Sequence, residues 1–247
     1  MKAIGIIPAR YQSSRFPGKP LVDLLGKTMI QRVYEQAKQS SLLSEVVVAT
    51  DDERIWNHVR DFGGHAVMTS VEHANGTSRC GEVIEKFPGY DVVINIQGDE
   101  PLVKPEQIDE VLSLFKRPEV EIGTVVKRLH HAADIENENR IKVVLDCAGF
   151  AMYFSRSPIP FVQGKNEAHW HEVLPYYKHI GIYAWRTSTL KKILLLEPAE
   201  IEKAESLEQL RWLFNGYKIA TVETHIETPN IDTPDDVAKV IRALNGG

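Results

Sequence analysis

Short apolar runs alternate with amphipathic segments along the first half of the chain. The apolar runs have the length of buried strands and span residues 3–8, 45–50, 65–70 and 90–97. The segments between them place apolar residues at helical spacing and span residues 27–39, 51–63, 76–87 and 104–116. Gly63 and Gly64 end the second of these helices, and Pro105 lies in the first turn of the fourth. Alternating strands and helices predict a parallel sheet with helices on both faces.

The rhythm changes after Arg128. Residues 140–157 predict two strands joined at Asp146–Gly149, which makes a hairpin, and residues 176–186 predict a long strand. Further on, the pattern predicts helices at 190–196, 206–216 and 233–244 and a strand at 217–224. No linker or internal repeat divides the chain. We therefore expect one mixed α/β domain over residues 1–247, in which residues 130–190 form a less regular part that contributes acceptor-binding and dimerisation elements.

Composition and charge narrow the classes of function. The 247 residues are 43% hydrophobic and 26% charged, which is typical of globular proteins. The net charge of −5 argues against nucleic-acid binding through a basic face. No apolar run is long enough for a membrane span, and Pro8 and Arg10 interrupt the N-terminal apolar run too early for a secretory signal, so we expect a cytoplasmic protein. Cys80 and Cys147 form neither a metal motif nor a disulfide framework.

The loop after the first strand concentrates positive charge. The stretch IIPARYQSSRFPGKPL, residues 6–21, carries Arg10, Arg15 and Lys19 among small residues such as Ser13. It follows the carboxyl end of a strand, where ligands bind in open α/β sheets. Arginine offers paired donors to phosphate oxygens, and lysine offers a mobile charge. The alternative is a solvated loop, but three cations within ten residues favour a polyphosphate site. Neither the P-loop nor the dinucleotide fingerprint occurs.

Two acidic segments are candidates for binding a metal ion. Asp99 and Glu100 follow the apolar run at 90–97, at the same sheet edge as the cationic loop. The alternative there is a tight turn with solvated carboxylates. Near the C-terminus, Thr233 and Asp236 can cap the last helix, which leaves Asp232 able to face the site. Two carboxylates from distant segments suit Mg²⁺, which completes its shell with phosphate oxygens and water.

The turn HANGTSRCGEV, residues 73–83, combines a glycine with possible capping residues. Gly76 permits a close backbone approach to a base, and Thr77 or Ser78 could cap the helix that follows. Capping alone would account for the two hydroxyls. Arg79, in the first turn of that helix, is a candidate partner for substrate or phosphate.

Several polar residues of the second half are candidates for binding a ligand. Arg156 precedes a turn shaped by prolines and has the donor geometry for a carboxylate. His179 and Tyr183 share one face of the strand at 176–186, although a half-buried strand often carries such residues. Ser206 and Gln209 can form a capping box, which would account for Gln209 without any ligand.

Taken together, these segments resemble the sugar-acid cytidylyltransferases, and most closely the branch that activates 3-deoxy-D-manno-octulosonate (Kdo). From residue 4 to about residue 240, the resemblance runs in order through IIPARYQSSRFPGKPL, VVATDDERI, INIQGDEPLV, KVVLDCAGFAMYFSRSPIP, KHIGIYAWR, ESLEQLRWL and IDTPDDV. It implies a Rossmann-like nucleotidyltransferase fold with a mixed, mostly parallel sheet flanked by helices, and a homodimer. It also implies Mg²⁺-dependent transfer of CMP from CTP to the anomeric hydroxyl of Kdo, for lipopolysaccharide biosynthesis.

The same resemblance implies roles for individual residues. The implied catalytic residues are Arg10, Lys19 and Asp99, and the implied Mg²⁺ ligands are Asp99 and Asp232. The implied CTP contacts are Pro8, Ala9, Arg10, Ser13, Arg15, Lys19, Gly76, Arg79 and Gln97. The implied sugar contacts are Gln97, Arg156, His179, Tyr183, Glu208 and Gln209. Ser78 departs from the family pattern, which has an acid there. The alternatives are another ulosonic acid as acceptor (8-amino-Kdo or a sialic-type acid), a non-catalytic CTP sensor, and a scaffold that shares only the fold.

Overall fold

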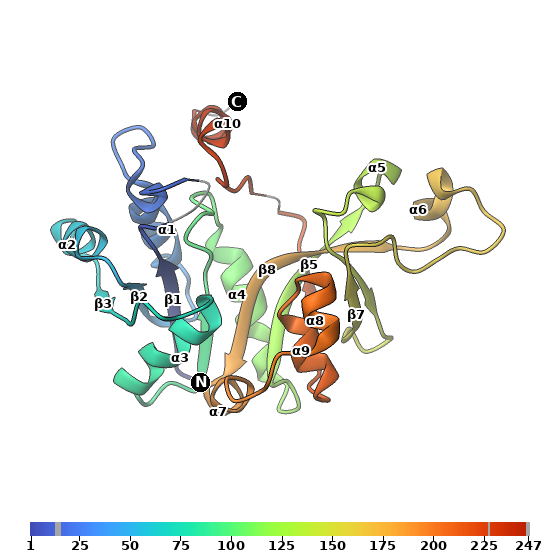
Figure 1. Ribbon diagram of the computed structural model, residues 1–247, viewed down its shortest axis with the longest axis horizontal. Helices are drawn as coiled ribbons and strands as arrows, with labels where there is room; N and C mark the ends of the chain where they lie inside the picture. The colour runs from blue at the N-terminus through green and yellow to red at the C-terminus, as the bar shows by residue number, and fades with distance from the viewer. Residues whose placement is uncertain (13–15, 227, 246–247) are drawn as a thin grey trace.

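Nine strands form one sheet within residues 1–12, 16–226 and 228–245, the residues that the computed structural model describes (Figure 1). In chain order they are β1 (Ala3–Ala9), β2 (Leu43–Thr50), β3 (Ala66–Met68), β4 (Val92–Asn95), β5 (Ile122–Leu129), β6 (Lys142–Leu145), β7 (Ala151–Ser155), β8 (Tyr176–Arg186) and β9 (Ile219–Glu223). The main order across the sheet is β3-β2-β1-β4-β8-β5-β9, and β6 pairs with β7 and β8 beside it. Only β8 runs antiparallel to its neighbours in that main order, so the predicted mixed, mostly parallel sheet is confirmed.

Helices cover both faces of the sheet because its strands are apolar on both sides. In β1, for example, Ile7 packs into one hydrophobic cluster and Ile6 into the opposite one. Within the described residues, every helix is too short or too polar to cross a bilayer. The α-helices are α1 (Met29–Ala37), α2 (Glu53–Asp61), α3 (Gly76–Lys86), α4 (Pro105–Ser113), α5 (Ala132–Glu136), α6 (Trp170–Val173), α7 (Thr187–Ile193), α8 (Glu200–Glu205), α9 (Gln209–Phe214) and α10 (Pro234–Leu244). Short 3-10 turns η1 (Lys19–Leu21), η2 (Leu114–Lys116) and η3 (Glu167–His169) complete the set.

The last helix returns to the N-terminal part of the fold. Ile231 and Val240 pack against Leu24 and Met29, which places α10 above α1 in Figure 1. At its start, the Asp236 carboxylate accepts hydrogen bonds from the Thr233 backbone N–H at 3.0 Å and from the Thr233 hydroxyl at 2.9 Å. The predicted cap is confirmed, and it fixes the segment that carries Asp232.

Four local features differ from the prediction. Strand β5 was not predicted, because the charged residues Lys127 and Arg128 directly follow its apolar first part. The helix predicted at 206–216 is shorter, since α9 begins at Gln209. Ser206 ends α8 in the left-handed region, with φ of 52°, so the capping box between Ser206 and Gln209 is wrong. Helix α7 spans Thr187–Ile193 instead of 190–196.

The predicted hairpin is confirmed as β6 and β7. The Asp146 carboxylate accepts hydrogen bonds from the backbone of Ala148 and Phe150, both at 2.8 Å, and Gly149 supplies a φ of 77°. The segment between β7 and β8, which includes α6, extends away from the main sheet in Figure 1. It belongs to the part for which dimerisation and acceptor binding were predicted.

Candidate active site

Two adjoining cavities open where β1 and β4 end. The first has a volume of about 400 Å³, and we call it the cationic pocket; it is lined by Pro8, Ala9, Arg10, Gln12, Lys19, Pro20, Met29, Gln97, Gly98 and Asp99. The second has a volume of about 430 Å³, and we call it the polar pocket; it is lined by Pro8, Arg10, Ala74, Asn75, Gly76, Thr77, Asn95, Gln97, Gly181, Tyr183, Glu208, Gln209 and Trp212. Pro8, Arg10 and Gln97 line both, so a ligand in one pocket can touch a ligand in the other.

Lys19 gathers three distant segments in the cationic pocket. Its Nζ donates to Asp99 Oδ2 at 2.8 Å and to the Ile231 carbonyl at 2.8 Å, and it lies 3.9 Å from Asp232 Oδ1. At Gly98 a Cβ atom would stand 2.8 Å from the Pro8 carbonyl oxygen. Glycine therefore allows the turn before Asp99 to lie directly against the end of β1. The structure thus brings together Lys19, Asp99 and Asp232, as predicted.

The two aspartates fit a divalent cation of hard character. Both carboxylates already face one positive charge, the Lys19 ammonium. Oxygen donors of this kind suit Mg²⁺, which retains water and phosphate oxygens as further ligands. Within the described ranges, no group of three or more His, Cys, Asp and Glu side chains could hold a metal ion. Asp99 and Asp232 could hold such an ion together with further oxygen ligands, such as phosphate and water.

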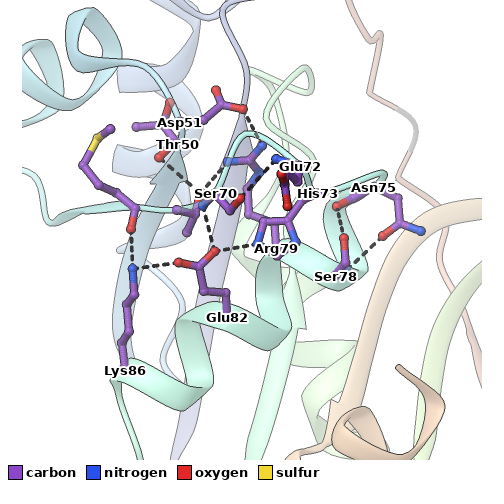
Figure 2. Close-up of polar contacts among 12 residues, drawn as sticks. Thr50, Asp51, Ser70, Glu72, His73, Asn75, Ser78, Arg79, Glu82 and Lys86 are labelled. Carbon is purple, nitrogen blue, oxygen red and sulfur yellow. Dashed lines mark hydrogen bonds and ion pairs between the residues drawn. The ribbon is translucent and has the colours of Figure 1, made fainter. Parts of the chain in front are cut away.

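Arg10 is held by the loop that precedes α3. Its guanidinium donates to the His73 carbonyl, and His73 Nε2 lies 2.5 Å from Glu82 Oε2. Glu82 also accepts from the Ser70 backbone N–H and pairs with Lys86, both at 2.8 Å (Figure 2). Burial alone would raise the Glu82 pKa, but these hydrogen bonds lower it to about 2. Among the other predicted CTP contacts of this region, Ser13 and Arg15 lie outside the described residues.

The cap of α3 differs from the prediction. Asn75, and neither Thr77 nor Ser78, is the N-cap; its side-chain oxygen accepts from the Ser78 backbone N–H at 2.9 Å (Figure 2). The Ser78 hydroxyl donates back to the Asn75 carbonyl at 3.0 Å. Ser78, where the family has an acid, therefore helps to close the helix cap and lines neither pocket.

Arg79 is buried in the protein and does not reach either pocket. The side chain is fully buried, donates to Asp51 Oδ2 at 2.7 Å and to the Thr69 hydroxyl, and lines neither pocket (Figure 2). This placement contradicts a direct contact between Arg79 and CTP. The guanidinium instead pairs with Asp51 and Thr69, which connects α3 to the residues that follow β2 and β3.

The polar pocket gathers most of the predicted sugar contacts. Gln97 Nε2 donates to the Gly181 carbonyl at 2.8 Å, and the Thr77 hydroxyl donates to Glu208 Oε2 at 2.9 Å. Burial raises the Glu208 pKa, and the Thr77 hydrogen bond opposes that shift. Gln209 Nε2 is buried with no hydrogen-bond partner in the described residues. Because Gln209 caps no helix, its amide is available to a ligand in the pocket.

His179 and Arg156 lie outside the polar pocket. His179 lines a neighbouring cavity of about 200 Å³, its Nε2 lies 3.0 Å from the Thr124 hydroxyl, and burial lowers its pKa to about 3. The centroid of the His179 ring lies 5.0 Å from that of the Tyr183 ring, so the two rings pack against each other. The Arg156 guanidinium donates to the Glu205 carbonyl at 2.7 Å and to the Glu138 carbonyl at 3.2 Å. These backbone acceptors take two of the donor groups of Arg156, and its contact with the sugar stays a prediction.

One residue of the polar pocket, Asn95, has no role in the sequence predictions. It ends β4, where residues 90–97 were interpreted as an apolar strand. The available signal was a polar residue two positions before Gln97, which period-two alternation places on the same side of the strand.

Comparison with known proteins agrees with the fold. A profile of the family described as "Cytidylyltransferase" matches residues 4–219, and the chain belongs to this family. Two curated relatives are named 3-deoxy-manno-octulosonate cytidylyltransferase. The relative from Parabacteroides distasonis is 53% identical and is covered over 98% of its length by 99% of this chain. The relative from Geobacter sulfurreducens is 46% identical and is covered over 100% of its length by 99% of this chain.

Solved structures show the same fold. A structure of CMP:2-keto-3-deoxy-manno-octonic acid synthetase complexed with CTP is 42% identical and has a TM-score of 0.93, over 100% of this chain and 99% of that one. A cytidylyltransferase structure from Leptospira borgpetersenii has a TM-score of 0.66 at 17% identity, over 100% of this chain and 88% of that one, and shows the fold alone. The predicted nucleotidyltransferase fold and the resemblance to the sugar-acid cytidylyltransferases are confirmed.

Proposed function

We propose that this chain transfers CMP from CTP to the anomeric hydroxyl of Kdo and releases pyrophosphate. The observation that carries the proposal is 53% identity, over almost the whole chain, to a protein named 3-deoxy-manno-octulosonate cytidylyltransferase. A CTP complex of a 42% identical protein with the same fold supports CTP as the nucleotide. The names of the relatives favour Kdo over 8-amino-Kdo, sialic-type acids and a non-catalytic sensor.

In the proposed reaction the anomeric oxygen attacks the α-phosphorus of CTP, and the bond to the bridging oxygen of pyrophosphate breaks. Charge on the departing pyrophosphate must be neutralised, which is the main catalytic task in transfers of this kind. Arg10 and Lys19 line the cationic pocket and supply that charge. The His73 carbonyl holds Arg10, and Asp99 holds Lys19, so both cations are oriented before a ligand arrives.

Asp99 and Asp232 would hold Mg²⁺ in this proposal. When bound, the ion would offset phosphate charge and lower the pKa of the attacking hydroxyl. The support is the donor chemistry: two carboxylates from distant segments converge on the Lys19 ammonium. A salt link of this kind also keeps the two carboxylates in place without a metal.

The acceptor sugar would occupy the polar pocket. Tyr183, Glu208 and Gln209 line it and offer hydroxyl, carboxylate and amide groups to the sugar hydroxyls. Gln97 lines both pockets and would place the sugar beside the α-phosphate. The proposal thus assigns CTP phosphates to one pocket and the acceptor to the other.

The proposal includes a homodimer that forms through the segment around β7. Met152, Tyr153, Phe161 and Val173 are exposed, and β7 pairs with β6 alone among the described strands. Exposed apolar residues beside a sheet edge suit contact with a second copy. Light scattering should give twice the chain mass, and Met152→Lys should shift the protein toward the monomer; a monomeric parent would refute this part. The proposal also places the reaction in the cytoplasm, as a step of lipopolysaccharide biosynthesis.

The experiment that tests the function is pyrophosphate release by the purified chain. CTP and Mg²⁺ are supplied with Kdo, 8-amino-Kdo or N-acetylneuraminate in parallel reactions, and Asp99→Asn is the matched control. We expect release with Kdo from the parent and none from the variant. Release only with another acid would refute Kdo as the acceptor, and CTP binding without any release would favour the sensor.

A further inference from the structure

A buried amide in the polar pocket has no part in the proposed function so far. Asn95 is 6% exposed, and its Oδ1 has no hydrogen-bond partner in the described part of the chain. The rest of β4, residues 92–94, is apolar and fully buried. An unpaired polar atom in a buried strand destabilises the fold, because it has lost water and gained no partner. A ligand that supplies the partner would explain why this position is polar.

Two further unpaired groups surround the same cavity. Tyr183, directly opposite Asn95 in the β4–β8 ladder, has a hydroxyl without a hydrogen-bond partner, and so does the Nε2 atom of Gln209. Tyr183 is 8% exposed and Gln209 is 5% exposed. All three side chains line the polar pocket. Independent packing defects would not be expected to gather in one cavity, whereas the partners of one bound molecule would.

The neighbourhood also fixes the position of the Asn95 amide. A Cβ atom at Gly76 would stand 3.0 Å from Asn95 Nδ2 and 3.3 Å from Pro8 Cγ. Glycine at position 76 therefore leaves room for the amide at the start of α3. Gly76 also lines the polar pocket, and the close approach to a base that was predicted for it stays a prediction. The amide is held between α3 and β8, at the wall of the pocket.

We infer that Asn95 is a substrate-binding residue that hydrogen-bonds hydroxyl groups of the acceptor sugar and sets specificity for a polyhydroxylated acid. This inference rests on the proposed function. Hydroxyl and amide groups each donate and accept, which matches the hydroxyls of a sugar. A triphosphate beside Asn95 would face the Glu208 carboxylate, and of its two cationic partners Lys19 lines only the cationic pocket while Arg10 lines both. Asn95 also stands two residues before Gln97, which reaches the site where the sugar must meet the α-phosphate.

The test replaces the amide with an apolar side chain of similar shape. Asn95→Leu should raise the KM for Kdo by about 10- to 100-fold, because buried polar groups of the sugar lose a partner. The dissociation constant of CTP, measured by calorimetry without acceptor, should stay unchanged. The midpoint of thermal unfolding should stay the same or rise, because an unpaired buried atom is removed. A residue with only a structural role would not give that combination.

Gln107→Leu is the matched control. Gln107 is 1% exposed and has an unpaired Nε2, but it lies on α4 outside both pockets. It should leave both kinetic constants unchanged. If Asn95→Leu does not fold, Asn95→Ser, which is smaller and polar, should fold and still raise the KM for Kdo.

Three outcomes would overturn the inference or its basis, and they can be told apart. Weaker CTP binding with an unchanged KM for Kdo would assign Asn95 to the nucleotide. Unchanged constants for Kdo and CTP would make Asn95 structural. A parent chain that binds CTP but releases no pyrophosphate with Kdo would refute the proposed function itself, and this parent measurement comes first.

Discussion

Replacing Arg79 with methionine would leave the Asp51 carboxylate without its ion-pair partner. The Arg79 side chain is 0% exposed and that of Asp51 is 15% exposed, with 2.7 Å between Nη2 and Oδ2. The guanidinium also donates to the Thr69 hydroxyl, so the change removes a second buried hydrogen bond. We expect a loss of stability, and little change in CTP affinity, because neither Arg79 nor Asp51 lines a pocket.

The magnitude follows from the burial of the pair. Removing one partner of a buried ion pair costs about 3–5 kcal/mol. The partial exposure of Asp51 lets water reach the orphaned carboxylate, so we expect the lower end, about 3 kcal/mol. For a chain of this size, each kcal/mol moves the unfolding midpoint by about 2–4 °C, which predicts a fall of about 6–12 °C.

The assay is urea unfolding of four proteins: the parent, Arg79→Met, Asp51→Leu and the double variant. Each single variant leaves one buried partner unpaired, whereas the double variant leaves none. The double variant should therefore lose less stability than the sum of the single variants. Lys86→Met is the control, because its side chain is 46% exposed and its loss should change stability by less than about 0.5 kcal/mol. An Arg79→Met variant with parental stability and a tenfold higher KM for CTP would refute this reasoning and restore Arg79 as a nucleotide contact.

Three further predictions concern the cationic pocket and His179 in the neighbouring cavity. Asp99→Asn should abolish pyrophosphate release while circular dichroism and the unfolding midpoint stay near those of the parent; near-full activity would exclude a role in metal binding. Lys19→Ala should raise the KM for CTP and lower kcat, since the pocket loses a cation that faces the leaving group; steady-state kinetics with CTP as the varied substrate would measure both. His179 has a pKa lowered by burial to about 3 from 6.5, so its neutral form contributes stability that is lost as the pH falls below about 6.5 toward 3. His179→Gln should flatten the stability curve in that window, measured by urea unfolding, and an unchanged slope would contradict the burial argument.

The first half of the fold could be predicted from sequence because its signals are local. Apolar runs and amphipathic segments of ordinary length alternate there, and β1, β2, β3 and β4 appear where the pattern places them. Strand order could not be predicted in the same way. The insertion of antiparallel β8 between β4 and β5 depends on pairing between residues far apart in the chain. Strand β5 was missed because its own pattern breaks off at charged residues, and only its two neighbours make it a strand.

Chemistry of the site was predictable where a residue's type limits its role, and less so where burial decides it. Lys19, Asp99 and Asp232 were predicted as a cation and two metal carboxylates, and the fold brings them together. Arg79 shows the limit of the same reasoning. An arginine that binds a ligand and one that binds protein carbonyls or a buried aspartate are identical in sequence, and only packing separates them.

Strand β4 and the turn after it relate the two pockets to each other. Asn95 ends β4, Gln97 follows two residues later, and Asp99 lies in the turn that comes next. Asn95 lines the polar pocket, Gln97 lines both pockets, and Asp99 lines the cationic pocket. If the acceptor binds beside Asn95 and the metal beside Asp99, the attacking oxygen and the α-phosphorus must meet near Gln97. A single short segment would then set the distance between the two substrates.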